Sequence, residues 1–428
     1  MVTWKKLKTT DVDFETRFEQ MVREKERLIA DLESVVRPIV QGVKEKGDQA
    51  LFEYTKRFDG TSVDERSIRV SCDDLEEAYQ CITIEERDAL SLAADRIEQF
   101  HRKQFQQCSI ADACSDASVS EAVRPLQRVG VYVPGGKAAY PSSVLMTAIP
   151  ARVAGVKEVI MVSPGSSPYV LAAAHIAGVS QVYRVGGAQA VAALAYGTES
   201  IPRVDKVVGP GNRYVETAKR LLFGVVGLDM LAGPSEVLII ADDSGVPAFA
   251  AADLIAQAEH DEDAVPALIA TDEQFLAAVE REVQAQLPQT VRREIAERSI
   301  EKNGLMIYTP TLKNAVELAN RIAPEHLELM VSMPRNVLKG ITAAGAVFLG
   351  NYSPVAVGDY VAGPSHVLPT AGTARFFSPL GINDFLRRMS VIAFSKDEFM
   401  GLVPWSLRLA RLEGLDAHAR ALEKRSAQ

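Results

Sequence analysis

Cysteine is scarce in this chain of 428 residues, and the four cysteines form no CxxC pair. All of them lie in the first third of the chain, at Cys72, Cys81, Cys108 and Cys114. A zinc or disulfide framework would need cysteines in close, repeated pairs. The pattern instead predicts reduced thiols in a protein of the cytoplasm.

Long apolar runs and an excess of positive charge are also missing. No stretch of eighteen apolar residues occurs, and the N-terminal MVTWKKLK has no apolar core of a signal peptide. The formal net charge is −9, with lysine and arginine scattered along the chain. A basic surface for nucleic acid is therefore not indicated. We expect a cytoplasmic protein that binds neither membrane nor nucleic acid.

The remaining composition is that of a globular enzyme, with 47% hydrophobic and 24% charged residues. Short β-branched runs alternate with alanine-rich helical ones, the signature of parallel βαβ units. Strands are expected at 128–133, 159–163, 182–185, 204–208, 237–242, 267–270 and 305–308. Helices are expected within 13–57, 73–105, 170–178, 188–197, 247–259 and 273–286. The predicted fold is α/β, with two open, mostly parallel, incomplete Rossmann-like sheets flanked by helices and followed after about residue 380 by a helical tail.

Glycine-rich turns follow several predicted strands, as in parallel sheets that bind ligands at their carboxyl edge. The standard motifs are nevertheless incomplete. The segment GPGNRY (209–214) has tyrosine in place of the third glycine of GxGxxG, and GVYVPGGK (130–137) has its lysine one residue late for a P-loop. Such glycines also suit plain turns. The polar side chains of Tyr132, Gln189 and Asn212 in these turns favour a nucleotide site.

Histidine is scarce too, and four of the six histidines lie among other groups that bind metals or move protons. Gln257 and His260 are three apart in a predicted helix and would project from one face. With Asp359 in a glycine-flanked turn and His418 near the C-terminus, they form a nitrogen and oxygen donor set that suits zinc. A histidine beside acidic residues is about as often only a solvated helix face.

Glu325 and His326 form the best acid–base candidate. Pro324 suits the first turn of a helix, where the helix dipole would favour the ionised form of Glu325. The imidazole of His326 could move protons while the carboxylate activates water. The alternative is that Glu325 is merely an acidic residue of a first helical turn.

Together these segments resemble the histidinol dehydrogenase family. The resemblance runs in register from about residue 30 to 420 and rests on long, distinctive segments. They are GGAQA (186–190), VGPGNRYV (208–215), DMLAGPSE (229–236), AADLIAQAEHD (251–261), APEHLE (323–328), GDYVAGPSHVLPT (358–370) and EGLDAH (413–418).

The resemblance implies NAD-dependent, zinc-assisted, four-electron oxidation of L-histidinol to L-histidine through L-histidinaldehyde, the final steps of histidine biosynthesis. It implies proton transfer by His326 and activation of water by Glu325. The implied zinc ligands are Gln257, His260, Asp359 and His418. The implied cofactor contacts are Tyr132, Gln189 and Asn212, and the implied substrate contacts are Ser235, His366 and Glu413, with His326 and the four zinc ligands.

The chain is expected to divide into four parts, and the resemblance implies an intertwined homodimer. The expected parts are an N-terminal arm (1–26), an α/β domain made of 27–129 with 238–377 that carries the metal and acid–base residues, a Rossmann-like NAD domain (130–237) and a helical tail (378–428). The tail would cross to the other subunit, where Glu413 and His418 complete its site.

Three other interpretations remain open from the residues. A zinc hydrolase could use the same metal, carboxylate and histidine, but it would not explain the glycine turns. A non-catalytic binding protein with two α/β sheets would leave the Glu325–His326 pair idle. A related oxidoreductase could act on another amino alcohol, although His366 and Glu413 suit the imidazole and amine of histidinol.

Overall fold

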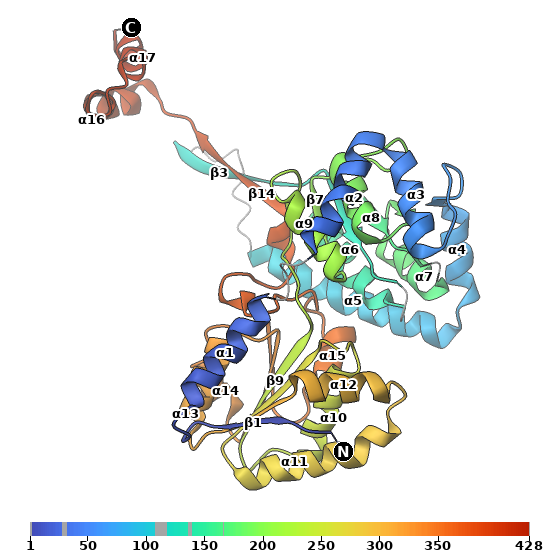
Figure 1. The fold of residues 1–428 in the computed structure, drawn as a ribbon. Coiled ribbons are helices and arrows are strands. Elements are labelled where there is room, and N and C mark those ends of the chain that lie inside the picture. The colour runs from blue at the N-terminus through green and yellow to red at the C-terminus, as the bar shows by residue number, and fades with distance from the viewer. Residues whose placement is uncertain (1, 28–31, 108–117, 136–138, 166, 428) are drawn as a thin grey trace. The chain divides into compact units, whose positions relative to one another are not determined.

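The computed structural model describes residues 2–27, 32–107, 118–135, 139–165 and 167–427, which form two units. The main unit comprises residues 1–105 and 126–385, and the tail unit comprises 106–125 and 386–428. The predicted α/β class, with two mostly parallel sheets and a helical C-terminal tail, is confirmed (Figure 1). Within the described ranges, no helix has both the length and the apolar character needed to cross a bilayer.

The first sheet of the main unit has six parallel strands in the order β1-β11-β10-β9-β12-β13. These strands are β1 (Lys5–Lys8), β9 (Glu236–Ala241), β10 (Val265–Ala270), β11 (Leu305–Tyr308), β12 (His326–Met330) and β13 (Ala346–Leu349). The accompanying helices are α1 (Phe14–Arg27), α10 (Pro247–Ala258), α11 (Glu273–Gln286), α12 (Arg293–Asn303), α13 (Leu312–Ile322), α14 (Pro334–Leu338) and α15 (Val355–Tyr360).

Both faces of this sheet are buried, which explains the nearly continuous apolar runs of its strands. Side chains alternate between the faces along β9. Val237 and Ile239 pack among residues of α10, α11 and α12, whereas Leu238 and Ile240 pack among residues of α1 and α13. Figure 1 shows these two groups of helices on opposite sides of the strands.

The second sheet has the order β2-β6-β5-β4-β7-β8 and is parallel except for β2, which runs antiparallel to β6. Its strands are β2 (Arg69–Val70), β4 (Arg128–Tyr132), β5 (Glu158–Val162), β6 (Gln181–Tyr183), β7 (Lys206–Val208) and β8 (Gly227–Leu228). The neighbouring helices are α2 (Glu33–Lys46), α3 (Asp48–Asp59), α4 (Cys72–Cys81), α5 (Ile84–Gln107), α6 (Pro141–Val153), α7 (Pro168–Ala177), α8 (Gly187–Tyr196) and α9 (Arg213–Leu222).

The structure distributes the first 130 residues differently from the expected domain division. Residues 1–26 are not a separate arm, because β1 pairs with β11 and Phe18 is buried in the core of the first sheet. Residues 27–129 do not accompany 238–377 as expected. Val36 and Leu51 pack instead with Tyr132 in the core of the second sheet, and β2 extends that sheet. An amphipathic stripe in the sequence indicates that one face of a helix is buried, but it does not identify the sheet against which that face packs.

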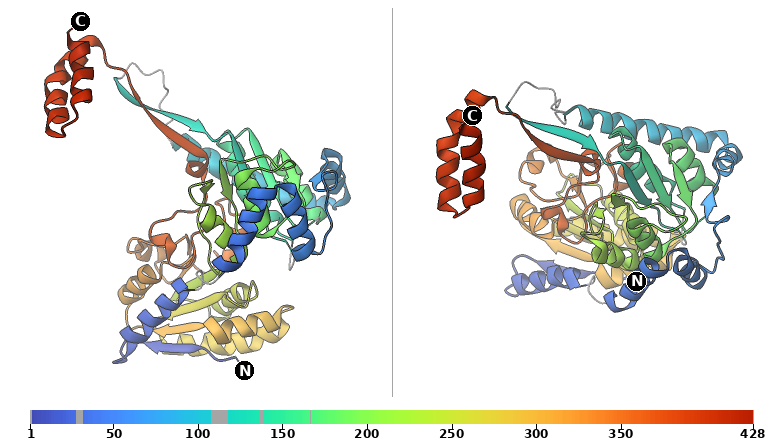
Figure 2. Two further views of the ribbon diagram at one scale, coloured as in Figure 1. Left: turned by 45° about the horizontal axis from the view of Figure 1, so that its top comes forward. Right: turned by 90° about the horizontal axis from the view of Figure 1, so that it is seen from above.

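The tail unit begins with a strand pair that the sequence did not reveal. Strand β3 (Val119–Pro125) runs antiparallel to β14 (Leu386–Ile392), in the segment expected to be helical. Helices α16 (Lys396–Leu412) and α17 (Asp416–Ser426) follow and confirm the helical part of the expectation (Figure 2). In α16, Leu409 and Leu412 are exposed. Val403 and Ala410 are among the few buried apolar residues that the structure describes in the tail unit. The described part of the tail therefore has little core of its own.

The cysteines that the structure describes fit the expected reduced state. Cys72 and Cys81 are free, exposed thiols. Cys108 and Cys114 lie outside the described residues, as does the lysine of the P-loop-like segment, Lys137.

A substitution tests the packing of α1 on the first sheet. Phe18→Ala should lower the free energy of unfolding by about 3–5 kcal/mol, because a fully buried aromatic ring is replaced by a cavity. Chemical denaturation of the variant would measure this loss. Val12→Ala, at a fully exposed position of the same segment, is the control and should leave stability unchanged. Equal stabilities of the two variants would contradict this packing.

Candidate active site

The backbone of Glu236, the first residue of β9, holds both members of the predicted acid–base pair. Its N–H donates to Oε2 of Glu325 at 2.8 Å. Its carbonyl oxygen lies 3.0 Å from Nδ1 of His326, which begins the neighbouring strand β12. Because a carbonyl oxygen only accepts, Nδ1 must carry the proton and Nε2 keeps its lone pair. That Nε2 atom is buried, and it has no hydrogen-bond partner among the described residues.

Burial determines the charge of this pair. It lowers the pKa of His326 to about 4, so that the imidazole is neutral at physiological pH. It also raises the pKa of Glu325 well above its ordinary value. The expected helix at Pro324 is wrong, because Pro324 and Glu325 connect the end of α13 to β12. No helix dipole therefore favours the carboxylate, and desolvation favours the neutral acid instead.

Asp359 and His366 face His326 from the segment around α15. Oδ1 of Asp359 lies 3.8 Å from Nε2 of His326. Burial raises the pKa of Asp359 to about 6. Nδ1 of His366 donates to the Asp359 carbonyl oxygen at 2.9 Å, which leaves its Nε2 to accept from the Ser143 hydroxyl at 3.3 Å. Burial, and next the neighbouring His260, lower the pKa of His366 to about 4. Three imidazoles and a carboxylate thus share one region.

Gln257 and His260 lie at the end of α10, although not in the single helix that we expected. Helix α10 ends at Ala258, and the N–H of His260 donates to the carbonyl oxygen of Gln257 at 3.3 Å across the following turn. Gln257 is buried. Much of the His260 surface is accessible, yet desolvation by the surrounding protein lowers the pKa of its imidazole.

The residues of this region suit a divalent cation in their chemistry, but the main unit supplies only part of a ligand set. In the described part of the chain, no three His, Cys, Asp or Glu side chains are arranged to hold a metal ion. Asp359 is a desolvated carboxylate beside imidazoles, and Gln257 adds a buried amide. Such nitrogen and oxygen donors are typical of zinc sites that also bind substrate. Glu413 and His418 are exposed side chains of the tail unit.

The three residues expected to contact a nucleotide lie at or after the carboxyl ends of strands of the second sheet. The hydroxyl of Tyr132, at the end of β4, accepts the N–H of Gly187 at 3.1 Å, and burial raises the pKa of Tyr132 to about 12. Gln189 is buried in the first turn of α8, where its Nε2 has no partner among the described residues. Asn212 caps α9, because its Oδ1 accepts the N–H groups of Tyr214 and Val215.

Gly209 brings the turn before Asn212 into contact with the end of β4 at Tyr132. Its φ of +107° is unsuited to other residues, and a Cβ there would lie 2.3 Å from the Tyr132 carbonyl oxygen. The turn before Asn212 therefore packs directly on the end of β4. Tyr132 contacts both this turn and the start of α8, so the three polar turns meet at the carboxyl edge of the second sheet.

Two residues of the first site had not been anticipated. In the sequence Glu236 directly precedes the apolar run 237–241, and a carboxylate at the edge of such a run was the available signal. Its side chain is buried and accepts the N–H of Ala371 at 2.8 Å. Ser143 carries no comparable signal, since its contact with His366 joins residues 223 positions apart. Ser235 precedes Glu236, and its carbonyl oxygen accepts the N–H of Val265 at 3.0 Å.

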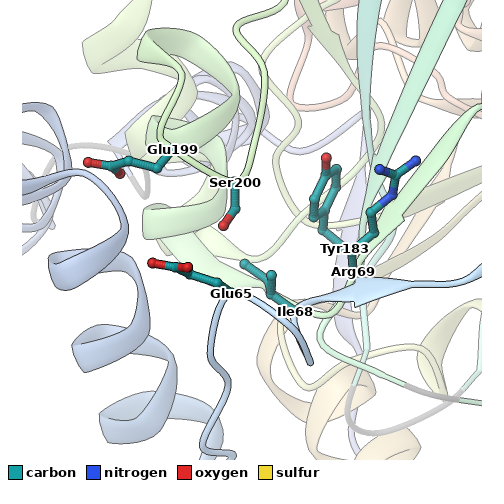
Figure 3. Close-up of a pocket in the computed structure, with 6 residues that line it drawn as sticks. All are labelled: Glu65, Ile68, Arg69, Tyr183, Glu199 and Ser200. Atoms are coloured by element: carbon teal, nitrogen blue, oxygen red, sulfur yellow. The ribbon is translucent and has the colours of Figure 1, made fainter.

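A separate pocket of about 330 Å³ lies beside β2 and β6 (Figure 3). Its lining residues are Glu65, Ile68, Arg69, Tyr183, Glu199 and Ser200. None of them belongs to the predicted site. This pocket lacks the histidines and the buried carboxylates that distinguish the region around His326.

Comparison with known proteins identifies the family. The family model described as histidinol dehydrogenase matches residues 22–426. The chain belongs to the histidinol dehydrogenase family. Histidinol dehydrogenase of Geobacter metallireducens is 50% identical over 420 residues, which cover 97% of this chain and 96% of that protein. The Aquifex aeolicus enzyme is 49% identical, with 98% of each chain covered.

A solved structure agrees with this assignment. The crystal structure of histidinol dehydrogenase from Elizabethkingia anophelis superposes with a TM-score of 0.92 at 34% identity and covers 100% of this chain and 99% of that one. An aldehyde dehydrogenase from Bartonella henselae, at 11% identity and a TM-score of 0.52 with 89% of this chain and 91% of that one covered, shares only the fold. The predicted family and enzyme class are confirmed: the chain is an oxidoreductase of histidine biosynthesis that acts on a small molecule.

The protonation state of His326 can be tested by NMR. At about pH 6, below the ordinary imidazole pKa, the nitrogen shifts of labelled histidine should show a neutral ring at this position with the proton on Nδ1. His326→Gln identifies the signal by its disappearance. A charged ring at this pH, or a proton on Nε2, would contradict the assignment.

Proposed function

We propose that this enzyme oxidises L-histidinol to L-histidine through L-histidinaldehyde, reducing two NAD⁺ and consuming one water, in the cytoplasm and as an intertwined homodimer. Family membership supports the reaction class. The observation that carries the mechanism is the buried, unpartnered Nε2 of a neutral His326, facing Asp359. A lone pair without a partner in a buried site needs a ligand to supply the missing hydrogen bond.

His326 is suited to remove the hydroxyl protons that both oxidations release. A hydride leaves a carbon atom only if the oxygen on that carbon gives up its proton. The hydrogen bond from Nδ1 to Glu236 keeps the lone pair on Nε2, where it can accept that proton. The same bond holds the ring in one orientation.

Glu325 is suited to the second oxidation, in which water must add to the aldehyde. Its Oε2 is held by the N–H of Glu236, and the carboxyl group adjoins His326. Because burial raises its pKa, the carboxylate form becomes populated only at higher pH than for an ordinary glutamate. Activation of water requires that form. The second oxidation should therefore depend more steeply on pH than the first.

Gln257, His260 and Asp359 would hold zinc, together with His418 from the tail of another copy of the chain. Bound zinc would supply a fixed positive charge that orients the imidazole and amine of the substrate without taking part in electron transfer. Ser235, His366 and Glu413 would complete the substrate contacts. His366 is held by Asp359 and Ser143, which fixes its ring beside His326.

NAD would bind at the carboxyl edge of the second sheet, against Tyr132, Gln189 and Asn212. Two features support this placement. The buried amide of Gln189 has an unused donor, and the turn at Gly209 brings backbone close to the end of β4. Ligands of open parallel sheets bind at this edge.

Two variants should separate the two half-reactions. His326→Ala should lower the rates of histidinol and histidinaldehyde oxidation alike, by roughly 10²–10⁴-fold, because both steps need the base. Glu325→Gln should lower chiefly the oxidation of histidinaldehyde and abolish the steep pH dependence of that step. Steady-state assays with each substrate measure the difference. Equal losses on both substrates in Glu325→Gln would refute the division of roles.

The yield of NADH tests the overall reaction and the metal together. Complete conversion should give close to two NADH for each histidinol consumed. A chelator should abolish turnover, and added zinc should restore it, because the ligand set suits that ion. The control is chelator supplied already saturated with zinc. A yield of one, or turnover that resists chelation, would contradict the proposal.

A further inference from the structure

Three ionisable side chains are buried together behind the glycine turn of the second sheet. Lys219 and Glu216 belong to α9, and Asp229 follows β8. Nζ of Lys219 lies 2.8 Å from Oδ1 of Asp229 and 3.6 Å from Oε1 of Glu216. All three residues are buried, and Lys219 is completely so. We call this group the buried triad.

The buried triad holds both polar backbone groups of Gly209. Nζ of Lys219 donates to the Gly209 carbonyl oxygen at 3.1 Å. The Gly209 N–H donates to Oδ2 of Asp229 at 2.8 Å. The turn also packs against the Tyr132 carbonyl oxygen so closely that a methyl group on Gly209 would not fit. The triad and the end of β4 together constrain the conformation of the turn.

The other contacts of the buried triad fix the segment that leads into β9. Oδ1 of Asp229 accepts the N–H of Met230 at 2.7 Å, and Oε2 of Glu216 accepts the N–H of Ala232 at 2.8 Å. The next residue, Gly233, donates its N–H to the hydroxyl of Thr370. This segment ends at Glu236, whose backbone anchors Glu325 and His326. The hydrogen bonds of the buried triad and the intervening chain, residues 229–236, therefore connect the glycine turn with the acid–base pair.

A gain in folding stability does not by itself explain why three ionisable side chains are buried together. Desolvation of charges offsets their attraction, and well-packed apolar residues often serve equally well or better. Burial raises the pKa of Glu216 to about 7, against the attraction of Lys219. The two carboxylates nevertheless raise the pKa of Lys219 in spite of its burial, so the ammonium group keeps its charge and all its donors. What the triad adds is directional bonding to particular backbone atoms.

We propose that Lys219, with Asp229 and Glu216, is a positioning residue that holds the Gly209 turn in the shape that binds the nucleotide and ties it to the segment carrying Glu236. This inference rests on the proposed binding of NAD at that turn. None of the three side chains needs to touch the cofactor. Their effect would pass through the backbone of Gly209 and residues 229–232.

The test compares two buried substitutions on the same helix. Lys219→Met keeps the bulk of the side chain but removes its donors, and it should weaken NAD binding about tenfold. Leu222→Ala, also fully buried on α9, destabilises the fold through a cavity but leaves the triad intact. It should keep the NAD dissociation constant within about twofold of wild type. Calorimetric titration of NAD into the intact protein measures both.

Steady-state kinetics add a readout that general destabilisation would not move. In Lys219→Met the KM for NAD should rise about tenfold, whereas the KM for histidinol stays within about twofold. Asp229→Asn, a nearly isosteric change, should weaken NAD binding in the same direction and serves if Lys219→Met does not fold.

The possible failures are distinguishable. If wild-type protein does not bind NAD, the proposed function fails and this inference with it. If wild type binds NAD while the folded triad variant binds it equally well, only the positioning role is overturned. The same conclusion follows if Leu222→Ala weakens NAD binding as much as the triad variant does.

Discussion

The parallel pairing of β9 with β12 is the constraint on which the candidate site depends. It brings residues about ninety positions apart into register, so that the backbone of Glu236 meets both Glu325 and His326. The backbone of Glu236 thereby determines the tautomer of the His326 imidazole and holds Oε2 of Glu325 in place. Because the strand is central in its sheet and buried on both faces, these anchors have little freedom to move.

Burial then sets the charge of the site. It lowers the pKa of His326 and of His366 and raises the pKa of Glu325 and of Asp359, so each group is biased towards its neutral form. Among the described residues, no neighbouring cation lowers the pKa of Glu325 or Asp359 against this bias. Positive charge brought by ligands would favour the carboxylates, and this couples their ionisation to binding.

The two sheets carry the two groups of candidate site residues at different ends of their strands. In the second sheet these residues lie at the carboxyl ends, whereas in the first sheet Glu236 and His326 are the first residues of β9 and β12. The second sheet presents the turns around Tyr132 and Gly209, and the first sheet presents the acid–base pair and its imidazole neighbours. Residues 229–236 run from one to the other. In this segment the backbone N–H groups of Met230, Ala232 and Gly233 donate to the side chains of Asp229, Glu216 and Thr370 respectively. A short segment of chain therefore links the two groups of candidate site residues.

The sequence by itself determined the α/β class, most strand and helix positions, and the residue types of the site, because periodicity and glycine turns are local properties. It could not determine that residues 5–8 complete the first sheet, that 386–392 form a strand, or that Pro324 precedes β12 rather than a helix. Those depend on partners far along the chain. The tautomer of His326 and the pKa of Glu325 were likewise decided only by tertiary structure, since both follow from burial beside the backbone of Glu236.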